Sequence, residues 1–234
     1  MSDSTVVLIT GVARGIGQAL AKAYLSRPNH TVLGTIRDPS AQSLSALSSH
    51  VPAQGSRLLL FTLESTTASH YADLVSSLKT AGITHLDLVI ANAGVAYPAG
   101  TPASVDVEDV KNVFDVNALG TLRLFQALRG FLEVGSNNGR RVKWCPLPVF
   151  SALERKKKSV RLSLVQTEMG NKGAQKMGLK EAPNTVEEAI TKTLAAKLNR
   201  DLRLMRGRRQ IDSATREDTS GKFLNIIDGA EVPW

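Results

Sequence analysis

This chain of 234 residues has little cysteine, few aromatic residues and no long apolar run. A single cysteine, Cys145, excludes an intrachain disulfide and fits a reducing compartment such as the cytoplasm. A membrane-spanning helix needs roughly 20 successive apolar residues, so the sequence predicts no membrane partner. The N-terminus lacks the pattern of a signal peptide. The four histidines have no metal-ligand spacing, which predicts no metal site.

Positive charge is concentrated in two short segments. Twelve of the 29 Lys and Arg residues, but only two of the 21 acidic residues, lie in 142–164 and 197–210. The rest of the chain is therefore slightly acidic, although the net charge is +8. A protein that binds nucleic acid usually carries its positive charge along an extended surface. The concentration of charge in two short segments argues against nucleic-acid binding. We expect a small-molecule partner and no nucleic acid, with a homo-oligomer left open.

Apolar strands alternate with amphipathic helices through the first half of the chain. Continuous β-branched and apolar runs, typical of strands buried on both faces, occupy 5–9, 30–36, 57–62 and 86–91. Helical patterns occupy 15–25, 71–80, 107–132 and 185–196, the last with a capping box, and 223–227 reads as a final strand. The alternation predicts an α/β fold with a doubly wound parallel sheet, in one domain over 1–234.

A glycine-rich turn joins the first strand to the first helix. Gly11 permits a tight turn, while Gly15 and Gly17 let the backbone approach a pyrophosphate at the positive end of the helix. Glycines also serve plain strand-to-helix packing. In this strand–turn–helix context, however, the pattern favours dinucleotide binding.

The end of the second strand should select the cofactor. A carboxylate there would bond the ribose of NAD, whereas an arginine accommodates the additional phosphate of NADP. The chain has Arg37 followed by Asp38, with Arg14 inside the glycine turn. The two bases favour NADP, although Asp38 adjoins the site, and both arginines could instead be merely solvated.

These motifs resemble the short-chain dehydrogenase/reductases, through T-G-x-x-x-G-I-G, Asn92-Ala93-Gly94 and Asn117. Further pieces are similar to fungal ketoreductases of the norsolorinic acid ketoreductase type, which reduce polyketide ketones in mycotoxin pathways. Among them are Thr84–Asp87, Val165–Gly170, Thr219–Gly221 and the ending Pro233-Trp234. The similarity covers 5–141, 165–196 and 211–234.

The resemblance implies roles for individual residues. Asn117 is the one catalytic-type residue, and the others contact the cofactor. Ile16 lies near the phosphates, Glu64 meets the adenine and Asn92 lies beside the ribose. The remaining candidates are Ala93 and Gly94 beside Asn92, Arg123 on the helix of Asn117, and Val165 and Thr167 at the nicotinamide amide. The structural alternatives are a strand-ending turn for 92–94 and a polar residue bonding backbone for Asn117.

The resemblance also shows what is missing. In the family, a serine after the fifth strand and a Tyr-x-x-x-Lys helix carry the chemistry, with tyrosine as the general acid. Four residues after Tyr24, Tyr71 and Tyr97 stand proline, valine and threonine, never lysine. The segment 142–164 therefore replaces the fifth strand and catalytic helix with too few residues. Because Pro146 and Pro148 lack ladder donors, we expect 142–164 to be irregular, and 197–210 likewise.

Two interpretations follow. The first is an NADP-dependent ketoreductase by descent, acting on an aromatic polyketide or a similar ketone of secondary metabolism. The second is a catalytically inactive nucleotide-binding protein, or a defective gene product in which 142–164 and 197–210 are misread sequence. The lack of the Tyr/Lys pair leaves open whether the chain is an active enzyme.

Overall fold

A computed structural model of the chain describes residues 4–40, 44–96, 103–146, 165–176, 178–194, 223–224 and 231–232. The chain separates into two compact units, Met1–Phe150 and Ser151–Trp234, which are treated one at a time. The predicted single domain stays a prediction. Residues 147–164 and 197–210 lie outside the described residues.

A parallel sheet of five strands forms the centre of the first unit. Its strands are β1 (Thr5–Thr10), β2 (His30–Ile36), β3 (Arg57–Thr62), β4 (Leu88–Ala91) and β5 (Lys143–Pro146), in the order β3-β2-β1-β4-β5. Thr5 pairs with His30 and Thr10 with Thr35, so β1 and β2 run side by side over their whole common length. The parallel arrangement predicted for the first four strands is confirmed.

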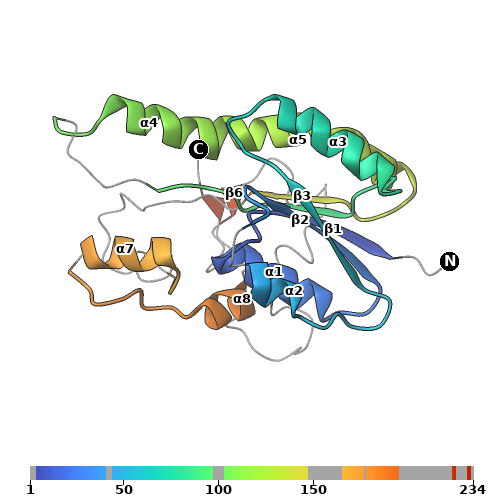
Figure 1. Cartoon of the computed structure of the whole chain (residues 1–234), viewed down its shortest axis with the longest axis horizontal. Helices are drawn as coiled ribbons and strands as arrows, with labels where there is room; N and C mark the ends of the chain where they lie inside the picture. The colour runs from blue at the N-terminus through green and yellow to red at the C-terminus, as the bar shows by residue number, and fades with distance from the viewer. Residues whose placement is uncertain are drawn as a thin grey trace. The chain divides into compact units, whose positions relative to one another are not determined.

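Helices cover both faces of this sheet (Figure 1). On one face lie α1 (Gly15–Leu25) and α2 (Ser45–Ser48). On the other face lie α3 (Ser69–Thr80) and a long helical segment made of α4 (Val107–Phe114), the π-helix Asp115–Leu119 and α5 (Gly120–Asn137). The main core forms where Leu8 and Val89 of the sheet pack against Leu74 and Leu128 of these helices. Doubly wound α/β architecture is thus confirmed.

The prediction of irregular structure is wrong for Lys143–Pro146, which forms β5. Lys143 pairs with Leu88 and Pro146 with Ala91, at one end of the strand order. Pro146 is the last residue of the strand, and the three residues before it all have a backbone N–H that can pair with a neighbouring strand. The missing N–H of proline therefore does not prevent Lys143, Trp144 and Cys145 from forming a strand. The Trp144 ring packs edge-on against Phe125 of α5, with 5.1 Å between ring centroids.

Cys145 is expected to react slowly with alkylating reagents in the folded chain. Burial raises the pKa of its thiol from 9.0 to about 11, against a lowering effect of Lys143. The thiolate population at pH 8 is therefore about 100-fold smaller than for an ordinary thiol, and the thiolate is the nucleophile. Iodoacetamide labelling followed by mass spectrometry measures the rate cleanly, because the chain has one cysteine. Cys145 is partly buried, and equal rates for native and urea-unfolded chain would contradict the raised pKa of its thiol.

The second unit contains α7 (Glu168–Lys176), α8 (Val186–Leu194) and a hairpin of β6 (Phe223–Leu224) with β7 (Glu231–Val232). The capping box is confirmed at α8: the Glu188 amide donates to Thr185 Oγ1 at 3.0 Å, and the Thr185 amide donates to Glu188 Oε2 at 3.1 Å. A parallel bridge joins Val165 to Asn184. Among the described residues, no helix has the length and apolar character needed to cross a membrane.

Candidate cofactor site

The glycine turn lies at the carboxyl end of β1, as its position in a parallel sheet requires. Gly11 and Gly15 have φ of 72° and 61°, a region that favours glycine. At Gly17, an added Cβ would stand 2.3 Å from the Gly11 carbonyl oxygen and 2.5 Å from Nδ2 of Asn92. Only glycine fits there, so the turn and the start of α1 pack together without side chains.

The amino end of α1 has the character of an anion site. Arg14 precedes the helix in an extended conformation, and its side chain makes no capping hydrogen bond to the first turn. No acidic residue lies in that turn, which contains Gly15, Ile16 and Gly17. The first amide groups of a helix lack intrahelical partners and carry its positive dipole end. These backbone amides are of the kind that could hold a cofactor pyrophosphate.

The end of β4 is fastened to the glycine turn through Thr10. The Thr10 hydroxyl accepts hydrogen bonds from the amides of Asn92 and Ala93, both at 2.9 Å. Nδ2 of Asn92 donates in return to the Thr10 carbonyl at 2.9 Å. The segment ending at Gly94 therefore lies beside the turn. The role of Thr10 is not visible in the sequence, since any small polar residue could end this strand.

Charged side chains follow β2 and β3. Arg37 is 74% exposed, and its Nε lies 3.8 Å from Oε2 of Glu64. Arg14 is also exposed. The Asp38 carboxylate accepts from the Ser40 hydroxyl at 2.7 Å and from the Ser40 amide at 2.8 Å, and these bonds lower the Asp38 pKa. Asp38 is thus engaged within its own loop, whereas Arg37 keeps an open face.

Asn117 lies within the π-helix that interrupts the long helical segment. Its amide makes two hydrogen bonds with one residue: Oδ1 accepts from the Val95 amide at 2.9 Å, and Nδ2 donates to the Val95 carbonyl at 2.8 Å. The Thr121 hydroxyl donates to the Asn117 carbonyl at 3.0 Å. These contacts match the structural alternative for Asn117, in which a polar side chain bonds backbone. They also tie it to the loop that begins at Asn92.

The remaining predicted site residues, Arg123, Val165 and Thr167, make the following contacts within their own units. Nη1 of Arg123 donates to Asp115 Oδ1 at 2.6 Å and to the Ser65 carbonyl at 3.3 Å. Val165 and Thr167 belong to the second unit, where the Thr167 hydroxyl accepts from the Gly170 amide at 3.1 Å. The nicotinamide role of Val165 and Thr167 stays a prediction.

Neither tyrosine in the described part of the chain is placed like a general acid. Tyr71 is buried between α3 and α5, and its hydroxyl donates to the carbonyls of Ser65 at 2.8 Å and Gly120 at 3.1 Å. Burial raises the Tyr71 pKa. Tyr24 is buried on α1 with Arg27 stacked over its ring. Tyr97 lies outside the described residues.

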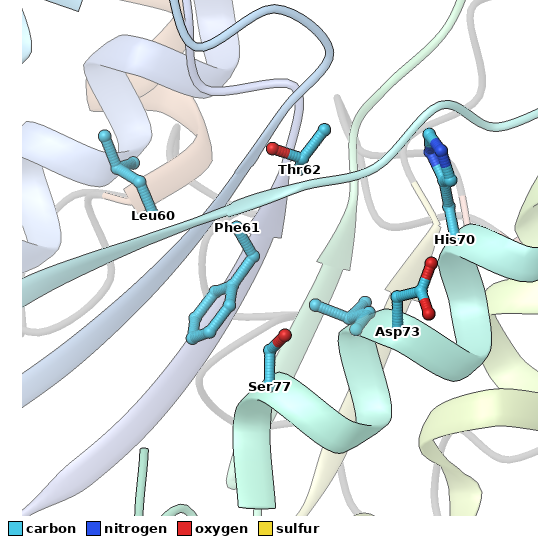
Figure 2. A pocket seen from close by; sticks show the side chains of 7 residues that line it. Leu60, Phe61, Thr62, His70, Asp73 and Ser77 are labelled. Carbon is cyan, nitrogen blue, oxygen red and sulfur yellow. The ribbon is translucent and has the colours of Figure 1, made fainter. Parts of the chain in front are cut away.

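A cavity of about 270 Å³ lies between β3 and α3, as Figure 2 shows. Nδ1 of His70, which lines the cavity, accepts from the Glu64 amide at 3.1 Å. Where side chains are described, no group of three or more His, Cys, Asp or Glu could hold a metal ion. The cavity is lined by Leu60, Phe61, Thr62, His70, Asp73, Leu74 and Ser77.

Comparison with known proteins identifies the relatives of this chain. It is 35% identical to the short-chain dehydrogenase srdF of Neurospora crassa over 268 positions, covering 100% of this chain and 99% of the relative. It is 31% identical to the norsolorinic acid ketoreductase nor1 of Dothistroma septosporum, covering 100% of this chain and 94% of that protein. An alignment of 268 positions against 234 residues leaves at least 34 positions, 268 minus 234, without a counterpart here.

The fold is similar to that of a solved NADPH-bound carbonyl reductase from chicken fatty liver. The TM-score is 0.72 at 22% identity, covering 99% of this chain and 94% of that one. The short chain dehydrogenase family profile matches residues 5–144, which contain the glycine turn, the Asn92–Gly94 segment and Asn117. The chain belongs to the short-chain dehydrogenase family.

Proposed function

We propose that this chain descends from NADP-dependent ketoreductases that reduce a ketone of an aromatic polyketide or a similar secondary metabolite. The observation that carries the proposal is the cradle formed by Gly11, Gly15 and Gly17 at the uncapped amino end of α1. The relatives named norsolorinic acid ketoreductases, at about 30% identity, support the substrate class.

The residues present would hold the cofactor in three places. The amides at the start of α1 bind the pyrophosphate, and Arg37 with Arg14 supplies positive charge for a 2′-phosphate. Glu64 and Asn92 hold the adenosine half. When bound, the cofactor supplies the hydride. Asn117 holds the Val95 backbone, and so keeps the loop after β4 against the site.

A second candidate function is a catalytically silent nucleotide-binding protein or a defective gene product. It is favoured by a specific observation, the lack of any Tyr-x-x-x-Lys in the sequence. Sequencing the genomic DNA and the transcript that encode residues 142–164 distinguishes the ketoreductase from the silent or defective protein. If another frame or splice form encodes a serine and a Tyr-x-x-x-Lys, the natural protein is the enzyme. If every transcript encodes the present residues, the silent protein is the better description.

Substituting Arg37 is expected to remove a preference for NADPH over NADH. A hydrogen bond to a charged group contributes about 1.5–3 kcal/mol, so Arg37→Ala should weaken NADPH binding by at least roughly tenfold and leave NADH unchanged. Titration followed by cofactor fluorescence measures both affinities. Arg129→Ala, at an exposed arginine of α5, is the matched control. Equal affinity of the unaltered chain for both cofactors, or no binding of either, would defeat the cofactor proposal.

A further inference from the structure

The loop that follows β3 is held by side chains from two different helices. The Ser65 carbonyl accepts from the Tyr71 hydroxyl of α3 at 2.8 Å and from Nη1 of Arg123 of α5 at 3.3 Å. Ser65 directly follows Glu64, which lies 3.8 Å from Arg37. Two donors therefore converge on the carbonyl of the residue that follows Glu64.

Arg123 is itself fixed by the π-helix. Its Nη1 lies 2.6 Å from Asp115 Oδ1, and the two side chains are 31% and 32% exposed. Asp115 begins the π-helix, two residues before Asn117. A half-buried ion pair is screened less than a surface pair, so this contact is stronger than the exposed pairs elsewhere on these helices. The sequence gives no sign of it, because Asp115 and Arg123 are eight positions apart across the π-helix, a spacing that no regular helical repeat brings together.

The loop also fits closely against the start of α5. A Cβ at Gly120 would stand 3.0 Å from the Ser65 Cβ, so a larger residue would push the loop away. The Tyr71 hydroxyl reaches the Gly120 carbonyl at 3.1 Å as well as Ser65. A tyrosine hydroxyl is protonated at neutral pH, and burial raises the Tyr71 pKa further, so the hydroxyl is a donor here. The end of β3 and the π-helix are thus joined by ionic, hydrogen-bonded and packing contacts at one place.

We propose that the contacts of Asp115, Arg123 and Tyr71 with one another and with Ser65 form a brace, which fixes the position of Glu64 for the adenosine half of the cofactor. The brace also fixes the position of Glu64 relative to the π-helix that carries Asn117. The inference rests on the proposed nucleotide binding. It assigns Arg123 as a positioning residue that acts through Ser65 and Glu64, in place of the direct cofactor contact that the resemblance implied. A small shift of a positioning group is sufficient to weaken a site built for one geometry.

The first test measures the binding of adenosine 2′,5′-bisphosphate and NADPH by calorimetry. Arg123→Gln should weaken both by roughly tenfold, the size expected for one charge-assisted hydrogen bond. In a Glu64→Ala background, Arg123→Gln should cause no further loss, because the brace acts through Glu64. Lys111→Gln breaks an ion pair of the same 2.6 Å length on exposed α4 and should change nothing. Equal weakening with and without Glu64 would show a merely structural role and overturn the proposal.

The second test needs no ligand. Hydrogen exchange on the free chain should be roughly tenfold faster at the amides of Glu64 and Thr67 in Arg123→Gln, with α1 unaffected. Asp115→Asn should give the same pattern, and serves if Arg123→Gln folds poorly. If the unaltered chain binds no nucleotide, the proposed function is wrong. The hydrogen-exchange experiment then still tests whether Arg123 and Asp115 hold the loop that carries Glu64. Unchanged exchange in both variants would overturn the brace, even where nucleotide binding is intact.

Discussion

Ketone reduction by this chain should be about 10²–10⁴-fold slower than by a version that carries a Tyr-x-x-x-Lys helix in place of residues 147–164. The carbonyl oxygen must receive a proton as the hydride arrives, and a positioned general acid contributes a factor of that size. In this chain, Tyr71 donates to backbone carbonyls in the core and Tyr24 is buried on α1. Neither is followed by a lysine four residues later.

The measurement is NADPH consumption by purified protein with an aromatic ketone. β5 exists from Lys143 to Pro146, so the replacement can begin directly after it. The matched control carries the same helix with Phe-x-x-x-Met, which restores packing without the acid or the lysine. Full activity of that control, or comparable turnover by the present chain, would show that the Tyr/Lys pair is unnecessary here.

Asp87→Ala should lower the free energy of unfolding by about 3–5 kcal/mol, the cost of leaving one partner of a buried ion pair alone. Asp87 is 8% exposed and directly precedes β4. Its carboxylate accepts from the Val6 amide at 2.7 Å and from both Nε and Nη2 of Arg140, the latter at 2.9 Å. Nη2 of Arg140 also donates to the Ser4 carbonyl at 3.0 Å. Removing the carboxylate leaves buried donors unsatisfied.

Urea unfolding followed by circular dichroism gives the free energy of unfolding. Glu108→Ala, which breaks the exposed pair with Lys111, is the control and should cost no more than about 1 kcal/mol. Replacing both Asp87 and Arg140 by apolar residues of similar size should recover much of the loss, because no charge then stays buried alone. A loss below about 1 kcal/mol for Asp87→Ala would mean that water reaches this pair freely.

Most of the fold could be predicted because its signals are local. A strand buried on both faces must be apolar throughout, as in Val6–Ile9, so the residue types alone indicate where it lies. The capping box at Thr185 and Glu188 involves neighbours three positions apart, so the sequence alone predicts it. The element ends differ from the prediction: β4 begins at Leu88, two residues later than predicted, and α5 continues to Asn137 instead of 132.

The sequence by itself determined the parallel α/β sheet, the glycine turn and the lack of a Tyr/Lys pair, since each depends on residue type and short spacing. Only the tertiary structure decided the strand at Lys143–Pro146, the bonding of Asn117 to Val95 and the ion pair of Arg123 with Asp115. β5 forms because β4 presents an open row of backbone partners, whatever the side chains that follow. Asn117 bonds a residue 22 positions away, and Arg123 pairs with a residue eight positions away across the π-helix. Neither spacing belongs to the repeat of a regular helix or strand, so the sequence alone does not indicate these contacts.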